Sequence, residues 1–315
     1  MTRNRPFDIL SVGELLIDLM SANFADSLSE ISTFQRHPGG SPANLCMNMA
    51  RLGNRTKLVA SVGKDDLGQF LLDYVQTLPI DCADLSQVVA PTTIILVTRS
   101  KSVANFEAYR GADCQITPIQ LKEEILKKVS IFHTTCFALS QQPAQSTILE
   151  AAQKAANLGC QLSIDANYAS KIWPNRIAAQ KVVADYCQLG AIIKMSEVDW
   201  ERLYEHPLDN PQKAFTHLLS LGAKEVCLTL GRDGCWVGNP QEIQFLPARK
   251  VTVKDTTGAG DAFWSGYLTA YLDGHSLINR AKAGRSMAEL KIGHLGTLPP
   301  KVSKDLIYAD IEIVE

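Results

Sequence analysis

The sequence predicts an α/β fold with a mainly parallel sheet, covered by helices on both faces, and a second, smaller β-sheet. Short apolar strands alternate with helical segments over most of the 315 residues, as is typical of parallel sheets with two buried faces. Two stretches, 15–38 and 92–112, interrupt this alternation and contain no convincing helix. We therefore expect a single domain, residues 1–315, into which these two stretches are inserted as a small separate sheet.

The expected elements follow one another in a regular order. Phe7–Val12 is the first expected strand, and Ser41–Arg51 is an expected helix because Leu45, Met49 and Leu52 share one face before Gly53 ends it. The other expected strands are 56–62, 129–134, 161–164, 191–194, Glu225–Thr229 and the β-branched run 251–253; the other expected helices are 67–78, 143–158, 197–205, 211–221, 262–272 and 278–292. Within 92–112, apolar runs at 93–98 and Phe106–Tyr109 flank the polar Lys101-Ser102 and predict a hairpin.

Composition and charge exclude several classes of protein. The chain is 46% hydrophobic, which suffices for a large core, and its net charge of −2 with no basic stripe argues against a nucleic-acid partner. The apolar run near the N-terminus is broken at Gly13-Glu14, so we expect neither a signal peptide nor a membrane span. The eight cysteines form no C-x-x-C pair and have no histidine at metal-binding spacing, so they are expected to be core thiols of a cytoplasmic protein.

The most informative segment is Lys-Asp-Thr-Thr-Gly-Ala-Gly-Asp-Ala-Phe at 254–263, directly before an expected helix. The amides of Gly258, Ala259 and Gly260 would be free donors at the helix N-terminus, where the helix dipole also attracts an anion. Asp261 would repel a resting phosphate, but it is well placed to accept a proton from an attacking hydroxyl. The segment predicts a phosphoryl-transfer site, although a glycine turn with a capping aspartate would give the same short string.

Two longer strings resemble the signatures of the ribokinase-like (PfkB) carbohydrate kinases. Asp-Thr-Thr-Gly-Ala-Gly-Asp at 255–261 resembles the C-terminal signature, and Pro-Gly-Gly-Ser-Pro-Ala-Asn at 38–44, followed by a helix ending at Leu52-Gly53, resembles the N-terminal one. The resemblance covers essentially the whole chain. It implies a ribokinase-like three-layer α/β/α sandwich with a β-sheet lid, a homodimer through that lid, and ATP-dependent phosphorylation of a sugar hydroxyl with Mg²⁺.

The resemblance also implies roles for individual residues. Asp261 is the expected base, and the amides of Gly258, Ala259 and Gly260 are expected to hold the γ-phosphoryl group. The expected sugar ligands are Asp18, Gly39, Gly40, Asn44, Tyr109, Arg110 and Asn167, and the expected nucleotide ligands are Lys194, Ser196, Thr229, Gly231, Gly234 and Thr257. Asp199 or Glu197 would act on Mg²⁺ through water, and Asp255 and Thr257, with the 293–297 stretch, would hold a K⁺ ion.

Each of these features also has a purely structural interpretation. Asp18 could be a solvated loop residue, Gly39-Gly40 only a turn, Tyr109-Arg110 a strand end, and the loop at 229–234 a turn between two strands. The chain also departs from the family in two places. Ala169 replaces an arginine that follows Asp165 and Asn167 in relatives, with Lys171 as a substitute two residues on, and Gly284-Arg285-Ser286 replaces a common Asn-Ala pair.

Among sugars, the motif at 39–44 and the Ile17-Asp18 pair look most like those of fructokinases. The nearest rivals, 2-keto-3-deoxygluconate kinases, handle a carboxylate, for which Arg110, Arg36 or His37 could provide a cation. Nucleoside and tagatose-phosphate kinases fit less well, because a phosphorylated substrate requires more basic residues than the sequence places at the site. A different class, a non-catalytic sugar-binding regulatory protein on the kinase fold, would be expected to lack Asp261. An oxidoreductase is excluded, since no G-x-G-x-x-G follows the first strand.

Overall fold

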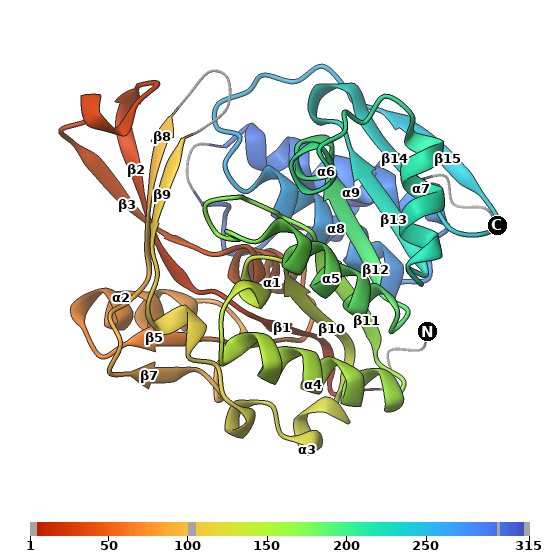
Figure 1. Cartoon of the computed structure of the whole chain (residues 1–315). Coiled ribbons are helices and arrows are strands. Elements are labelled where there is room, and N and C mark those ends of the chain that lie inside the picture. Colours follow the sequence, from red (N-terminus) through yellow and green to blue (C-terminus); the bar gives the residue numbers. More distant parts are fainter. Residues whose placement is uncertain (1–4, 100–104, 295–296, 312–315) are drawn as a thin grey trace.

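The computed structural model describes residues 5–99, 105–294 and 297–311. A nine-stranded sheet runs through the molecule in the order β15-β14-β13-β12-β11-β10-β1-β4-β6 (Figure 1). Its strands are β1 (Phe7–Val12), β4 (Thr56–Val59), β6 (Ile80–Asp81), β10 (Val129–Thr135), β11 (Gln161–Asp165), β12 (Ile192–Ser196), β13 (Glu225–Thr229), β14 (Gly234–Gly238) and β15 (Ile243–Pro247). All neighbours pair in parallel except β13–β14 and β14–β15, so the mainly parallel sheet is confirmed.

Helices cover both faces of this sheet, which confirms the three-layer arrangement. The helices are α1 (Ser41–Arg51), α2 (Asp66–Val75), α3 (Glu123–Leu126), α4 (Ala144–Asn157), α5 (Arg176–Cys187), α6 (Glu197–Tyr204), α7 (Pro211–Ser220), α8 (Ala259–Leu272), α9 (Leu277–Ile292) and α10 (Lys304–Tyr308). Successive residues of a strand point to opposite faces. In β1, Leu10 therefore belongs to the core on the side of α4, α5 and α7, whereas Ile9 belongs to the core on the side of α1, α8 and α9.

Helix α8 is the central helix of the second layer, and every residue from Ala262 to Leu272 is buried. Its contact with α9 is made at two glycines. A Cβ on Gly266 would lie 2.5 Å from the carbonyl oxygen of Ala283, and a Cβ on Gly284 would lie 2.9 Å from that of Phe263. Gly284 is one of the residues that depart from the family pattern, and close helix packing gives it a physical reason.

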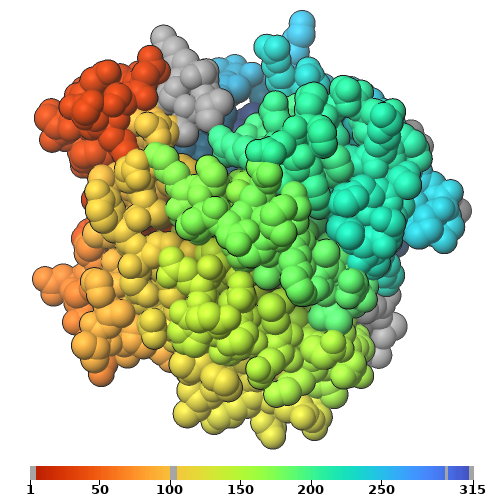
Figure 2. Space-filling view, in the orientation of Figure 1, coloured from red at the N-terminus to blue at the C-terminus, as the bar shows by residue number. Residues whose placement is uncertain are grey.

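A second sheet, in the order β3-β2-β8-β9, is built from β2 (Leu16–Phe24), β3 (Phe34–Gly39), β8 (Ile94–Arg99) and β9 (Phe106–Tyr109). These strands fall in the two predicted stretches, and the β8–β9 hairpin is confirmed, although its expected polar turn lies outside the described residues. The red strands at 16–39 project beside the body of the molecule (Figure 2). A short pair, β5 (Ser61–Gly63) with β7 (Ser86–Val88), forms a third sheet.

The structure corrects several details of the sequence analysis. Residues 251–253 form no strand, because Val251 and Val253 are exposed and extend along the surface without a partner strand. The predicted strand at 56–62 is two strands, and the helix predicted to end at 78 ends at Val75. Helix α5 was not predicted, because its apolar residues do not repeat as regularly as those of α1. The eight cysteines are free, and seven are buried, as expected of core thiols.

Within the described ranges, none of the helices combines the length and apolarity needed to cross a bilayer.

Candidate active site

Polar side chains, some of them expected from the sequence and some not, gather where parallel strands end. Glu14 follows β1, Asp165 ends β11, Lys194 lies near the end of β12, and Thr229 ends β13. The order of the strands in the sheet reverses at this point, since β1 is flanked by β4 on one side and by β10 on the other. Ligands bind at such switch points, outside the carboxyl ends of the strands.

The N-terminus of α8 presents backbone donors to this edge. Gly258 caps the helix in the left-handed region at φ 71°, a conformation that glycine adopts without strain. Among the described residues, the amides of Gly258, Gly260 and Asp261 have no hydrogen-bond acceptor, whereas the amide of Ala259 donates to the carbonyl of Thr256 at 3.1 Å. The anion site predicted from Gly258, Ala259 and Gly260 is therefore formed by a slightly different set of amides.

The two sequence signatures meet at the carboxylate of Asp261. Ser41 Oγ donates to Asp261 Oδ1 at 2.7 Å, and Asn44 Nδ2 donates to Asp261 Oδ2 at 2.9 Å. Both donors lie in the first turn of α1, so the N-termini of α1 and α8 face each other. Burial raises the pKa of Asp261 to about 6, with a further increase from the charge of Asp165, while Ser41, Asn44 and Lys194 oppose the rise. The carboxylate is thus oriented, ionised at neutral pH, and more basic than an ordinary aspartate.

Asp18, on β2, lies against the backbone of Gly39. A Cβ on Gly39 would approach Asp18 Oδ2 to 2.1 Å, so this side-chain position requires a glycine. Burial, and then the nearby charge of Asp261, raise the pKa of Asp18 to about 7. Asp18 can therefore both accept and donate hydrogen bonds near neutral pH, as a polyol ligand requires.

A buried lysine lies between the base and the strand ends. Lys194 Nζ bonds both carboxylate oxygens of Asp165, at 2.7 and 2.8 Å, and a Cβ on Gly260 would lie 3.4 Å from it. Asp199 forms a capping box with Ser196, whose hydroxyl donates to Asp199 Oδ2 at 2.6 Å. Burial raises the pKa of Asp199 to about 6, although Lys194 opposes the rise.

A cavity of about 360 Å³ opens beside these groups, between the small sheet and the body of the protein. Asp18 and Asn44 line it near the base, and Thr257 and Gly258 line it near the free amides. Residues from β2, β3 and β8 complete the wall on the side of the small sheet. The cavity brings together the expected acceptor ligands and the expected phosphoryl site.

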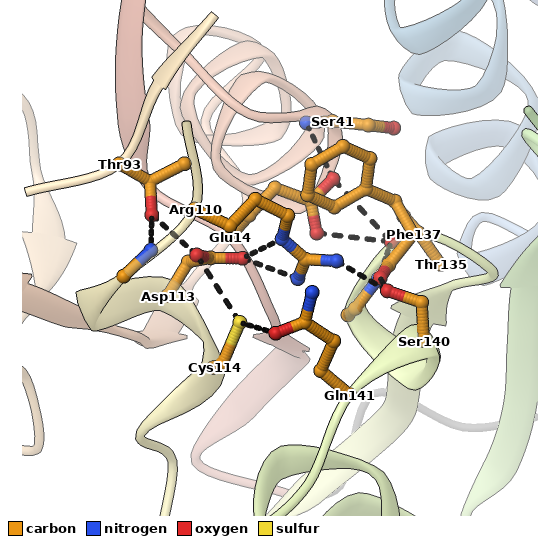
Figure 3. A network of polar contacts seen from close by, with 12 residues as sticks. Glu14, Ser41, Thr93, Arg110, Asp113, Cys114, Thr135, Phe137, Ser140 and Gln141 are labelled. Atoms are coloured by element: carbon orange, nitrogen blue, oxygen red, sulfur yellow. Dashed lines mark hydrogen bonds and ion pairs between the residues drawn. The ribbon is translucent and has the colours of Figure 1, made fainter. Parts of the chain in front are cut away.

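Glu14 connects the strand ends to the start of α1 (Figure 3). Its Oε1 accepts a hydrogen bond from the Ser41 amide at 3.2 Å, and its Oε2 accepts one from Thr135 Oγ1 at 3.0 Å. Burial raises the pKa of Glu14 to about 8, so it is protonated at neutral pH. Because Ser41 in turn bonds Asp261, Glu14 helps to position the Asp261 carboxylate.

With this geometry established, comparison with known proteins identifies the family. The model of the pfkB family carbohydrate kinases matches residues 7–304. The chain belongs to the pfkB family of carbohydrate kinases. It is 34% identical to the ATP-dependent 6-phosphofructokinase of Thermoanaerobacterium thermosaccharolyticum, over 94% of this chain and 91% of that protein. It is 30% identical to the probable fructokinase-2 of Arabidopsis thaliana, over 89% and 86% of the two chains.

Solved structures give the same result. The fructokinase of Halothermothrix orenii superposes with a TM-score of 0.77 and 31% sequence identity, over 93% of this chain and 100% of that one. The predicted family and the predicted ribokinase-like fold are therefore confirmed, and the chain is a carbohydrate kinase.

Several expected ligands are placed differently from the expectation. Tyr109 is 62% exposed. The Arg110 guanidinium is buried against Asp113 at 2.5 Å, donates to Ser140 and lies over the Phe137 ring, so it is already fully engaged (Figure 3). Asn167 Oδ1 accepts a hydrogen bond from the Phe137 amide at 3.0 Å and supports that loop.

The proposed substitute for the missing arginine is also engaged elsewhere. Lys171 bonds the Phe106 carbonyl at 2.8 Å and Glu107 at 2.5 Å, so it holds the β8–β9 hairpin instead of approaching the phosphoryl site.

On the nucleotide side, Thr229 and Gly231 lie beside the α6 N-terminus, with Glu197 Oε1 3.7 Å from a Cβ placed on Gly231. Strand packing alone requires a glycine at position 234, since a Cβ on Gly234 would lie 2.1 Å from the Leu246 carbonyl of the neighbouring strand. Thr257 remains at the cavity wall.

The expected potassium site is only partly described. Asp255 Oδ1 accepts from the Thr257 amide at 2.9 Å, and its Oδ2 lies 3.4 Å from Lys291 Nζ. Residues 295–296 of the expected loop lie outside the described residues. K⁺ binding therefore stays a prediction, which rates in potassium and tetramethylammonium buffers would test.

Sequence reasoning missed three residues of the site: Glu14, Ser41 and Asp165. Ser41 lies within the recognised motif, but its bond to a carboxylate 220 positions away has no local signal. Asp165 is the last residue of the buried strand β11, and Glu14 lies two residues after the end of β1; a carboxylate at the end of a buried strand is the signal that could have found them.

We expect Glu14→Gln to keep kcat within about threefold of wild type, because an amide oxygen can still accept from the Ser41 amide and the native carboxyl is already neutral. Glu14→Ala leaves that amide unpaired in a small cavity and should lower kcat by roughly tenfold or more and stability by about 2–4 kcal/mol. The measurements are steady-state kinetics and urea unfolding.

The pH dependence of the unfolding free energy distinguishes the effect of the Glu14 charge from the effect of its packing. Folded Glu14 keeps its proton to about pH 8, whereas the unfolded residue loses it near pH 4.3. Wild type should therefore lose stability across that window, and Glu14→Gln should gain relative to wild type as pH rises. A Gln variant as damaged as the Ala variant would contradict this account.

Proposed function

We propose that this kinase transfers the γ-phosphoryl group of ATP to a hydroxyl of fructose or of a closely related ketohexose. The observation that carries the proposal is the carboxylate of Asp261, which is fixed by two hydrogen bonds beside three backbone amides that have no acceptor among the described residues. A base next to an anion site suits proton abstraction from an alcohol that attacks a phosphoryl group.

In this proposal each group of the chain has a separate task. Asp261 takes the proton of the attacking hydroxyl, while the amides of Gly258, Gly260 and Asp261 face the oxygens of the transferring group. Lys194, which is paired with Asp165, lies on the same side, 3.4 Å from a Cβ placed on Gly260. Because these groups are in place before the reaction, positioning and electrostatics supply most of the acceleration.

Asp199, or Glu197 beside it, is the carboxylate that we propose acts on a magnesium ion that arrives with ATP. In the described part of the chain, no three His, Cys, Asp or Glu residues gather closely enough to hold a metal by themselves. Magnesium with ATP needs fewer protein ligands, since it takes phosphate oxygens and keeps several waters. Asp199, or Glu197 beside it, would bind through water, and the ion would neutralise charge on the phosphates.

Fructose is favoured as the acceptor unit by the cavity and by the relatives. Asp18 and Asn44 offer polar atoms suited to vicinal hydroxyls next to the base. The names of the relatives, fructokinase and 6-phosphofructokinase, share the fructose unit. Two of the three cations that could clamp the rival sugar acid are engaged elsewhere, since Arg110 is paired with Asp113 and Arg36 lies over the Phe70 ring, whereas His37 lines the cavity. A non-catalytic regulatory role is disfavoured, since the base and its supports are all present.

We propose further that the small sheet is a lid shared between two copies in a homodimer. The sheet forms one wall of the cavity through Met20, Gln35 and His37. Its β3 edge is unpaired in the described structure, and open edges favour pairing with another chain.

Bound fructose with an ATP analogue should slow amide hydrogen exchange in β2, β3, β8 and β9 more than in α4, which lies outside the site. Closure removes the edge amides from water, and pairing of two copies adds to that protection. Mass spectrometry of the exchange, with sedimentation to determine the oligomeric state, provides the measurement. Unchanged exchange in all four strands at saturation would reject the lid.

Asp261→Asn should lower kcat by about 10²–10⁴-fold, the usual contribution of a general base, and leave fructose binding within a few-fold of wild type. Wild-type kcat/KM should fall by about a factor of ten per pH unit below pH 6, because burial raises the pKa of this base to about 6 and only its ionised form accepts a proton. Asp209→Asn, an exposed control, should match wild type. An Asn variant with more than half of wild-type kcat would place the base elsewhere.

Fructose should be a better acceptor than 2-keto-3-deoxygluconate, measured as kcat/KM in a coupled ADP-release assay. Asp18→Ala should weaken the reaction with fructose by roughly 1–3 kcal/mol, the range for hydrogen bonds that involve a charged group. A higher kcat/KM for the keto-deoxy acid would show that the acceptor unit has been assigned wrongly, while the kinase chemistry would stand.

A further inference from the structure

A cation that was not expected from the sequence lies at the phosphoryl end of the cavity. In the part of the chain that the structure describes, the Lys and Arg residues of the cavity walls are Arg51, Arg99 and Lys291. Lys291 lies in the last turn of α9. A Cβ placed on Gly258 would lie 3.8 Å from Lys291 Cε, 3.8 Å from Asp261 Oδ2 and 3.9 Å from Asn44 Nδ2. Lys291 therefore meets the same glycine as the proposed base and its amide partner.

A single long ion pair holds Lys291 at this position. Its Nζ lies 3.4 Å from Asp255 Oδ2, whereas a good charge-assisted hydrogen bond measures about 2.7–2.9 Å. The side chains of Lys291 and Asp255 are only 12% and 14% exposed, so the pair is largely removed from water. An ammonium has three N–H donors. Two of those of Lys291 have no acceptor among the described residues.

The other lysines considered for the site are more fully engaged. Lys194 Nζ bonds both carboxylate oxygens of Asp165, at 2.7 and 2.8 Å. Lys171 holds the β8–β9 hairpin through the Phe106 carbonyl and Glu107. Of these three lysines, Lys291 is thus the one that combines a place beside the free amides with unused donors.

The end of α9 also holds the turn that precedes the free amides. The carbonyl of Ile292 accepts hydrogen bonds from the amides of Lys254 at 2.8 Å and Asp255 at 3.3 Å. Asp255 Oδ1 accepts a further one from the Thr257 amide at 2.9 Å. The Lys291 side chain and the backbone of the next residue therefore both act on Asp255, and Asp255 orients the peptide that leads into Gly258.

These contacts leave little room for a soluble cation at Asp255. Both of its carboxylate oxygens already have a donor, the Thr257 amide at one and the Lys291 ammonium at the other. A second cation beside the ammonium would be repelled, because like charges interact strongly where water is largely excluded. The potassium ion expected from the sequence and the lysine are therefore alternatives at this carboxylate.

We propose that the ammonium of Lys291 is the built-in cation of the phosphoryl site. It holds the 255–258 turn through Asp255, adds positive charge beside the Gly258 amide, and takes the place of a soluble monovalent cation. This role rests on the proposed function, which places the γ-phosphoryl group at these amides. As the acceptor oxygen bonds to the γ-phosphorus, the bond from that phosphorus to its bridging oxygen breaks, ADP leaves with the electron pair, and the proton goes to Asp261. Lys291 keeps its protons throughout and offsets charge on the phosphoryl oxygens.

The first test compares wild type with Lys291→Met and Lys291→Arg in a coupled ADP-release assay with fructose. Lys291→Met should lower kcat by roughly ten- to hundredfold and change KM for fructose less than about threefold, since the lost interaction involves a charged group and faces the phosphoryl group. Lys291→Arg keeps the charge and should lose less than about threefold in kcat. The control, Lys304→Met, removes a lysine of α10 that is paired with Asp273 at 2.8 Å and does not line the cavity, and it should match wild type.

Chemical rescue distinguishes the charge of the lysine from its packing. In Lys291→Ala, ammonium or methylammonium should raise kcat at least about fivefold and saturably, because a small cation restores part of the lost charge. Potassium should also stimulate this variant, whereas the bulkier tetramethylammonium should not. Wild-type kcat should agree within about twofold in potassium, sodium and tetramethylammonium buffers of one ionic strength, because its own ammonium already supplies the charge.

Binding of an ATP analogue gives a measurement that does not depend on the acceptor. Calorimetric titration with Mg²⁺ and the β,γ-imido analogue of ATP should give a Kd at least about fivefold weaker for Lys291→Met than for wild type, because the analogue places a γ-phosphoryl group at the free amides. ADP lacks that group, so its Kd should change less than about twofold. Circular dichroism shows whether each variant is folded.

The outcomes separate this role from the proposed function. Stimulation of wild type by potassium, together with near-wild-type kcat in Lys291→Met, would assign Asp255 to a soluble cation and overturn the inference. Losses that neither Lys291→Arg nor ammonium restores would show that the lysine is structural, and equal Kd values of wild type and Lys291→Met for the ATP analogue would also contradict the role. Failure of wild type to phosphorylate a ketose rejects the proposed acceptor, while the analogue titration still tests Lys291.

Discussion

The contact between the start of helix α1 and the start of helix α8 is the constraint on which the site depends. Two donors from α1, Ser41 and Asn44, bond the two oxygens of Asp261 on α8. A carboxylate bonded on both oxygens cannot rotate freely, so its orientation is set before any substrate binds. The same contact places the free amides of α8 at the end of the parallel strands, where the nucleotide phosphates are expected.

The buried carboxyl group of Glu14 supports this contact between the two helices. Glu14 is buried at the switch point between β1 and β10 and joins the Ser41 amide to Thr135. The Arg110–Asp113 ion pair lies next to Glu14 in the same polar network (Figure 3). Arg110 looked like a substrate ligand in the sequence, because an arginine at the end of an exposed hairpin is usually solvated. The fold instead buries it and leaves Arg51 and Arg99 facing the cavity.

The sequence predicted the fold class, both signatures and the two-sheet division, and it singled out Asp261, because each of these has a local pattern. Apolar periodicity identifies Phe7–Val12 and Ser41–Arg51, and glycine spacing identifies the α8 N-terminus. It did not predict which cations meet at the cavity, since Arg51 and Arg99 lie on separate elements that only tertiary packing brings together. It also predicted a strand at 251–253 from β-branched residues alone, although strand formation requires a neighbouring strand with which to pair.

The glycine contact between α8 and α9 has a consequence for how the protein can vary. Where Gly266 meets the Ala283 carbonyl, no side chain of Gly266 separates the two helices. Their spacing is therefore set by peptide geometry instead of by the volume of residues that mutation exchanges. Substitutions elsewhere in the core should therefore leave the distance between Asp261 on α8 and α9, the helix that is expected to border the nucleotide, unchanged. Residues on the acceptor side of the cavity can then change during evolution without moving the nucleotide site.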